Sequence, residues 1–317
     1  MKTSLTYDVI QPNIPIPIVP FGRTVKGSEK KMVMDNIVIQ NAREFKVPLS
    51  LMEEGIQVVH APTKLKNKDF YNEKDDSLIT SVYIDELCSI VKNVVGASMV
   101  TILPEDHFGN GSVYTVRNLK AAYTKIKRNG GGMKDALFNG NLSVPLRGAI
   151  HTDYAEESAI DIMKTIYESY PQFKNGRYVL LNAWRNIADI PVVDDNLCML
   201  KPSSMVKEED CITVALTSDN TSVNHIAKSV LQYHLSHTNV HKHEWVYYPN
   251  LVKNELLLFR QWDSDNLKEP VVFHSAFHDA NAPKNAPYRE SIEVRLVCLW
   301  EADVNGENHD SKDFSKL

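Results

Sequence analysis

Apolar and polar residues follow two different repeats in the first half of this chain. Three segments rich in apolar and β-branched residues predict β-strands at residues 34–39, 55–60 and 97–103. Between the last two, residues 76–95 carry apolar side chains every three or four positions, which is typical of an amphipathic helix packed on a sheet. A second helix is expected over residues 156–170.

Short strand patterns dominate the second half. They are expected at residues 177–184, 211–216, 244–249, 255–262, 271–274 and 291–300. Many strands of medium length with a few helices predict a mainly β fold with flanking helices, whose core is a jelly-roll barrel (a double-stranded β-helix, cupin-like). Such a barrel encloses a pocket in which inward side chains of different strands can meet.

The sequence contains no internal repeat, low-complexity segment or interdomain linker, so we expect a single domain over residues 1–317. Its proline-rich start, residues 1–32, is interpreted as an extended arm, and residues 303–317 as a polar tail. The glycine-rich stretch at residues 129–132 is expected to be flexible. It is not interpreted as a phosphate loop, because no strand-turn-helix pattern surrounds it.

Composition and charge exclude several classes of partner. The 317 residues are 43% hydrophobic, enough for a sizeable core, and the net charge of -5 gives no basic surface for nucleic acid. No run of about 18 apolar residues predicts a transmembrane helix, and the N-terminus lacks the apolar stretch of a signal peptide. The four cysteines have no CxxC spacing and are interpreted as reduced thiols of a cytoplasmic protein. Nothing in the sequence indicates the oligomeric state.

Two short motifs contain the residue types of a metal site. His151 and Asp153 are two residues apart, so on a strand both side chains point to the same face. A second imidazole from a distant strand, that of His274, would complete a triad of two histidines and one carboxylate. Such a triad leaves metal positions open and suits non-haem Fe(II) that activates O₂. The alternative for His151 and Asp153 is a structural pair that binds no metal.

A third motif could hold an acidic co-substrate. Arg289 and Ser291 share a strand face, and a guanidinium with a hydroxyl can bind a carboxylate. Arg295 is a rival on the same face, although a deep arginine more often pairs with a carboxylate such as Glu293 or Asp263.

The segment around residue 184 supplies candidates for substrate binding. Arg185 could reach an acidic group of the substrate or co-substrate, or form a structural ion pair with Asp194 or Asp195. Trp184 shares a strand face with Asn182 and could wall the pocket, although a tryptophan in the core is the commoner case.

Several longer motifs occur in a recognisable order: HTDY, RYVLLNAWRNI, DDNLCMLKPSSM, EWVYYPNLVKNELLLFRQWDSD and RESIEVR. Together they resemble a family of fungal and bacterial Fe(II)/2-oxoglutarate oxygenases, which includes the fungal gibberellin desaturase, the fumigatonoid endoperoxidase and a cephamycin methoxylation protein. The resemblance extends over residues 33–300. It departs from the family pattern at His278, where the family usually has an acidic residue.

The resemblance implies a role for each motif. His151, Asp153 and His274 would bind Fe(II), and Arg289 and Ser291 would hold the distal carboxylate of 2-oxoglutarate. The expected reaction uses O₂ to oxidise a C–H bond of a small secondary metabolite by hydroxylation, desaturation or oxidative cyclisation, with succinate and CO₂ as co-products. A non-catalytic jelly-roll binding protein and a zinc hydrolase are the competing interpretations.

Other histidines compete for the metal. His278 lies in a turn-like stretch and is expected to face solvent or to lie behind the ligands. Four histidines follow one another at irregular spacing in a polar setting, which indicates a solvated loop leading into a strand. They are His234, His237, His241 and His243.

Overall fold

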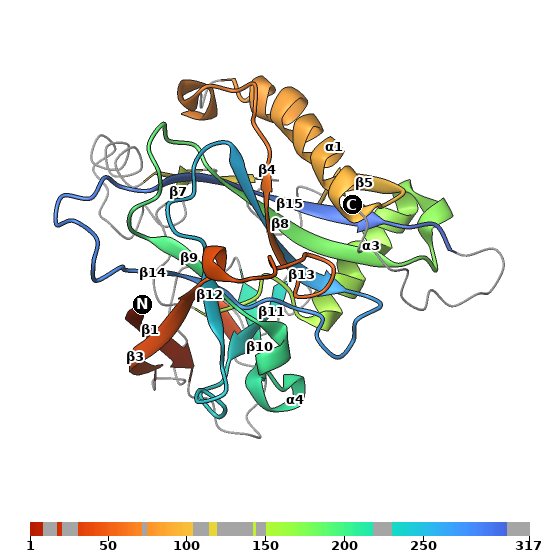
Figure 1. Cartoon of the computed structure of the whole chain (residues 1–317). Coiled ribbons are helices and arrows are strands. Elements are labelled where there is room, and N and C mark those ends of the chain that lie inside the picture. The colour runs from red at the N-terminus through yellow and green to blue at the C-terminus, as the bar shows by residue number, and fades with distance from the viewer. Residues whose placement is uncertain are drawn as a thin grey trace.

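The strands of the chain form two facing layers, shown in Figure 1. The computed structural model describes residues 1–8, 18–20, 31–71, 75–103, 114–118, 142–143, 150–217 and 230–302. The expected flexible stretch at 129–132 and the polar tail at 303–317 lie outside these residues. The mainly β jelly-roll fold predicted from the strand pattern is confirmed.

The larger sheet is built around two long central strands. Its order is β4 (Ile56–His60), β13 (Glu255–Asp263), β8 (Tyr178–Asn186), β15 (Glu290–Leu299), β6 (Tyr114–Asn118) and β7 (Leu142–Ser143), and β5 (Met99–Ile102) also pairs with β15. Both β8 and β15 are buried along almost their whole length. Side chains on one face of these strands therefore point into the interior between the layers, and those on the other face point outward.

The smaller layer consists of two groups of strands that are joined through His151. One part has the order β1 (Lys2–Asp8), β3 (Lys31–Asn41), β12 (Trp245–Tyr247), β9 (Asn196–Leu200) and β14 (His274–Phe277). The other has the order β11 (Val230–Leu235), β10 (Cys211–Thr217) and β2 (Ile18–Pro20). His151 forms isolated bridges with His274 on one side and His234 on the other, and so connects the two parts.

Helices cover the outside of the two layers of strands. A π-helical turn, η3 (Leu78–Tyr83), leads into α1 (Ile84–Val95), and α3 (Glu156–Ser169) follows the HxD motif. The other helices within the described residues are short: η1 (Ala42–Glu44), η2 (Asn67–Tyr71), η6 (Pro171–Phe173), η7 (Pro202–Ser204) and α4 (Lys207–Asp210). Among the helices of the described ranges, none has the length and apolar character needed to cross a membrane.

Helix α1 determines which face of the larger sheet is the outer one. Its buried residues Leu87 and Val91 belong to the same apolar cluster as Leu181 and Ala183 of β8 and Leu296 of β15, and Figure 1 shows the helix on the side of this sheet away from β9 and β14. The alternate residues of both strands therefore face the smaller layer. This is how polar side chains of β8 and β15 come to lie inside the fold.

One predicted strand was misplaced. Residues 271–274 were expected to form it, but β14 begins at His274 and runs to Phe277. The preceding residues cross between the layers: Val272 N donates to Arg260 O of β13, whereas Phe273 O accepts from Leu200 N of β9. A segment that bonds to both sheets cannot pair regularly with either, although it is apolar and buried.

The proline-rich arm is more integrated than expected. Residues 2–8 form β1, which pairs antiparallel with β3, and Leu5 and Tyr7 are fully buried. The Tyr7 hydroxyl accepts a hydrogen bond from Trp245 Nε1 at 3.0 Å. The N-terminal segment thus belongs to the smaller layer at these residues, and does not simply cross its surface. Strands β9 and β11 were also absent from the sequence prediction.

Candidate metal centre

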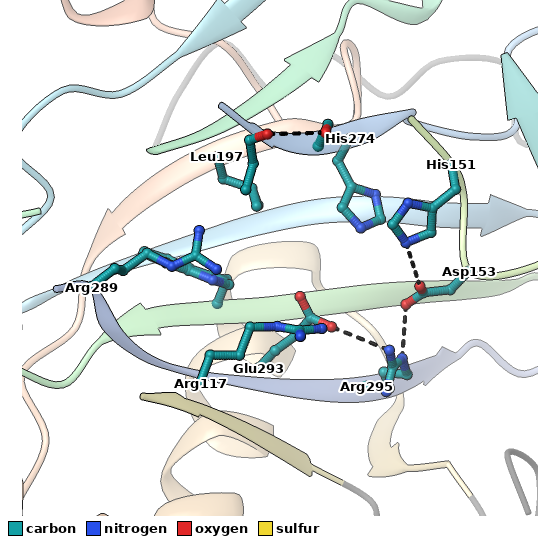
Figure 2. Close-up of a pocket in the computed structure, with 11 residues that line it drawn as sticks. Arg117, His151, Asp153, Leu197, His274, Arg289, Glu293 and Arg295 are labelled. Atoms are coloured by element: carbon teal, nitrogen blue, oxygen red, sulfur yellow. Dashed lines mark hydrogen bonds and ion pairs between the residues drawn. The ribbon is translucent and has the colours of Figure 1, made fainter. Parts of the chain in front are cut away.

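The three predicted ligands converge at the junction of the smaller layer (Figure 2). His151 and His274 exchange backbone hydrogen bonds, at 3.3 Å and 3.0 Å, so their side chains leave the backbone side by side. Their ring centroids are 4.5 Å apart. Asp153 lies two residues after His151, and one ligand atom from each of the three residues lies within 4.8 Å of the others. The sequence-predicted triad is therefore brought together in space.

The larger sheet holds the Asp153 carboxylate in one orientation. Its Oδ2 accepts hydrogen bonds from Asn182 Nδ2 and from Arg295 Nε, both at 2.8 Å. Its other oxygen, Oδ1, lies 3.7 Å from His151 Nε2. The Asp153 backbone N–H donates to Gln261 Oε1 at 2.6 Å. One carboxylate oxygen thus points toward the imidazoles, while the other is bound to the sheet.

The electrostatic setting keeps Asp153 and His274 in their metal-binding forms. Burial would raise the pKa of Asp153, but the charge of Arg295, together with its hydrogen bond and the nearby imidazoles, lowers that pKa below its ordinary value. Burial, with a contribution from His151, lowers the pKa of His274 to about 3. A carboxylate and a neutral imidazole are therefore present at neutral pH, as metal ligation requires. Two imidazole nitrogens and one carboxylate oxygen are a donor set that fits Fe(II) and leaves positions open.

The triad lines one end of a pocket that opens to solvent and holds about 380 Å³ of empty space, open solvent included. Besides the triad, its lining residues are Arg117, Trp184, Leu197, Ser275, Ala276, Arg289, Glu293 and Arg295. The three arginines outnumber the two carboxyl groups, those of Asp153 and Glu293, and this excess of positive charge suits an anion. In Figure 2, Arg117 and Arg289 extend toward the pocket from the side away from His151.

Arg289 lies in this pocket as the sequence predicted. It is buried, donates a hydrogen bond from Nη1 to Asp195 O, and its guanidinium lies 5.5 Å from the centroid of the Trp184 ring. These contacts fix the direction of the guanidinium. Ser291 is two residues further along the inner face of β15, with its Oγ buried and without a hydrogen-bond partner among the described residues. A buried hydroxyl of this kind is available to a ligand.

The role expected for Arg295 is confirmed in part. Its Nη2 lies 3.3 Å from Glu293 Oε1, which is one of the two structural pairings predicted. The other predicted partner, Asp263, instead accepts two hydrogen bonds from Arg177. The contact between Arg295 and Asp153 was not anticipated.

Arg185 does not belong to the pocket, and both of its expected roles are wrong. Side chains alternate between the two faces of a strand. Arg185 directly follows Trp184 on β8, so it points to the outer face of the larger sheet, away from Asn182 and Trp184. There its guanidinium donates to Tyr83 Oη and to the backbone carbonyls of Ala61 and Lys253. It pairs with neither a substrate group nor an aspartate. The role proposed for Asn182 also changes, because its amide contacts Asp153.

The competing histidines are resolved by their surroundings. His278 is exposed and lies 2.9 Å from Asp194 Oδ2, outside the triad. The four-histidine segment is not a solvated loop throughout, because His234 lies on β11 beside His151 and the His243 ring is buried 3.4 Å from Asp210 Oδ2. The loop prediction was therefore wrong for these two histidines.

Sequence reasoning missed Arg117. It lies on β6 directly opposite Ser291 of β15, and burial lowers the pKa of its guanidinium. The sequence signal that could have identified this strand is the alternation of apolar Tyr114 and Val116 with polar Thr115 and Arg117.

Comparison with known proteins gives a consistent result. A family model described as an Oxidoreductase/YMDC permease-like domain matches residues 18–299. The hydroxylase/desaturase efuI of Hormonema carpetanum is 24% identical, over 88% of each chain. The alpha-ketoglutarate-dependent dioxygenase tstK of Talaromyces stipitatus is 22% identical, over 87% of this chain and 89% of the relative.

The fold also matches a solved structure. The iron and alpha-ketoglutarate-dependent endoperoxidase NvfI superposes with a TM-score of 0.70 at 18% identity, covering 95% of this chain and 98% of the other. At this identity the likeness concerns the fold, which it supports along nearly the whole chain.

Proposed function

The chain belongs to the family described as Oxidoreductase/YMDC permease-like, and from this premise we propose that it is a non-haem Fe(II)- and 2-oxoglutarate-dependent oxygenase. The observation that carries the proposal is the convergence of His151, Asp153 and His274 beside a pocket that also contains Arg289. Two imidazoles and one carboxylate suit Fe(II), and the neighbouring guanidinium suits the second carboxylate of a dicarboxylic co-substrate.

Each residue has a distinct task in this proposal. His151, Asp153 and His274 hold the iron, while Arg289 and Ser291 bind the distal carboxylate of 2-oxoglutarate. With O₂, this centre supplies the oxidising power to break a substrate C–H bond, and succinate and CO₂ are the co-products. The indole of Trp184 walls the pocket and stacks with Arg289, which keeps water away from the co-substrate and holds the guanidinium in line.

The substrate class follows from the relatives. Two have names that give a hydroxylase/desaturase and an alpha-ketoglutarate-dependent dioxygenase, and a third is an Aspergillus protein named for aspirochlorine biosynthesis. We infer that the substrate is a small secondary metabolite that is hydroxylated, desaturated or cyclised. The four free cysteines support a reducing compartment, and we place the protein in the cytoplasm.

An anaerobic titration of the apoprotein with Fe(II) and 2-oxoglutarate tests the proposal. The wild type should develop the weak visible charge-transfer band of the iron–2-oxoacid chelate. The band should be absent in His151→Ala and His274→Ala and should need more 2-oxoglutarate in Arg289→Ala, whereas the control His278→Ala should behave as the wild type. A folded wild type that binds iron but gives no band would overturn the proposal and favour a non-catalytic binding protein. Preference for zinc in metal analysis would favour a hydrolase.

A further inference from the structure

The Asp153 carboxylate accepts hydrogen bonds from side chains of two neighbouring strands of the larger sheet. Asn182 of β8 and Arg295 of β15 face each other in register, on the inner face of the larger sheet. Both donate to the same oxygen, Asp153 Oδ2, at 2.8 Å. The register of one strand pair thus delivers two donors to a single acceptor atom.

Arg295 is itself held by a second carboxylate. Glu293 lies two residues earlier on the same face and is buried, and its Oε1 is 3.3 Å from Arg295 Nη2. The guanidinium is therefore fixed at both ends, with Nε toward Asp153 and Nη2 toward Glu293. Buried ion pairs of this kind contribute little net stability, because the desolvation of the charges offsets their attraction. The arrangement is therefore better explained as a means of orienting the Arg295 guanidinium than as a means of stabilising the fold.

The consequence concerns how many atoms Asp153 can offer to a metal. A carboxylate oxygen has two lone pairs, and both lone pairs of Oδ2 are occupied by hydrogen bonds. Only Oδ1, which lies on the side of His151, remains for ligation. A carboxylate that bound through both oxygens would take an additional coordination position. With one oxygen only, the three protein ligands would leave positions of a bound metal open for a co-substrate and O₂.

We propose that Arg295 and Asn182 are positioning residues that restrict Asp153 to a single ligating oxygen, and that Glu293 directs Arg295 for this task. The inference rests on the proposed function only in so far as the triad binds a divalent metal. It predicts that the pair directly affects metal affinity and the set of protein atoms that ligate the metal, in a protein that still folds.

The test uses Co(II), whose visible spectrum reports coordination number, with the full-length apoprotein under anaerobic conditions. Asn182→Ala removes one donor, and Arg295→Met removes the other; combining it with Glu293→Gln avoids leaving the buried Glu293 carboxylate without its partner. Arg177→Met is the matched control, because it breaks a double hydrogen bond to Asp263 on the same sheet away from the pocket. Competition with a chelator gives the Kd, and thermal unfolding gives the stability.

We expect each site variant to bind Co(II) roughly 10- to 100-fold more weakly, as is usual when partners of metal ligands are removed. The positions of the visible bands should change as the second oxygen of Asp153 enters the coordination shell, and the control should lose stability while keeping its Kd. Site variants that fold with the wild-type Kd and spectrum would overturn the inference. If the double variant does not fold, Asn182→Ala alone decides in the same way. A wild type that fails to bind Co(II) would instead refute the metal site, and with it the proposed function.

Discussion

The assignment of Arg289 as the anchor of the co-substrate can be tested by removing the same interaction from either partner. Arg289→Met removes the guanidinium, and 2-oxopentanoate has the chain length of 2-oxoglutarate without its distal carboxylate. Arg289 is only 4% exposed, so its contact with a carboxylate is desolvated and falls at the strong end of charge-assisted hydrogen bonds. We therefore assign about 3 kcal/mol to the contact, which is about a hundredfold in Kd.

The assay is an anaerobic titration of the Fe(II) protein with each 2-oxoacid. The wild type should bind 2-oxoglutarate about a hundredfold more tightly than 2-oxopentanoate, and Arg289→Met should bind both with similar, weak affinity. Arg289→Lys keeps the charge but loses the planar fork, so it should show an intermediate preference. If Arg289→Met keeps the wild-type preference, the assignment is refuted. If Arg117→Met loses the preference for 2-oxoglutarate over 2-oxopentanoate and Arg289→Met keeps it, the residue that binds the distal carboxylate is Arg117 of β6.

Three further predictions separate roles in the site from roles in the fold. Arg185→Met should lower the free energy of unfolding by about 3 kcal/mol, because two backbone carbonyls lose a charged donor. The Kd for 2-oxoglutarate should stay unchanged. Weaker binding of 2-oxoglutarate by a folded variant would show that this arginine does contribute to the pocket. His274→Ala should abolish Fe(II) binding, and His278→Ala should leave it within about twofold, since exposed ion pairs are weak; equal losses in equilibrium dialysis would contradict the choice of ligand. Gly55→Ala should destabilise by about 2–4 kcal/mol, because φ is +74° and the new Cβ would lie 2.9 Å from Val272 Cγ2; an unchanged denaturation midpoint would show that this backbone relaxes easily.

The local patterns of the sequence were sufficient for much of the site. The two-residue spacing of His151 and Asp153 places both side chains on one face wherever the segment is extended, and the same holds for Arg289 and Ser291. The same rule would have separated Arg185 from Trp184, since neighbouring strand residues point to opposite faces, but both were predicted as substrate-binding candidates. These relations depend on covalent geometry alone, which is why they can be read before the fold is known.

Only the tertiary structure decided which distant residues meet. The turn-like stretch around His278 favoured His274 as the ligand, but whether His274 meets His151 depends on β14 beginning at the residue that pairs with His151. The junction of Arg295 with Asp153 and Asn182 likewise depends on the register between β8 and β15 and on the helix that covers their other face. Register is a property of the packed sheet as a whole, because a shift of one residue would turn every inward side chain outward. The sequence by itself therefore determined which side chains could act together on one strand, and the packing of the two layers determined which of them form the site.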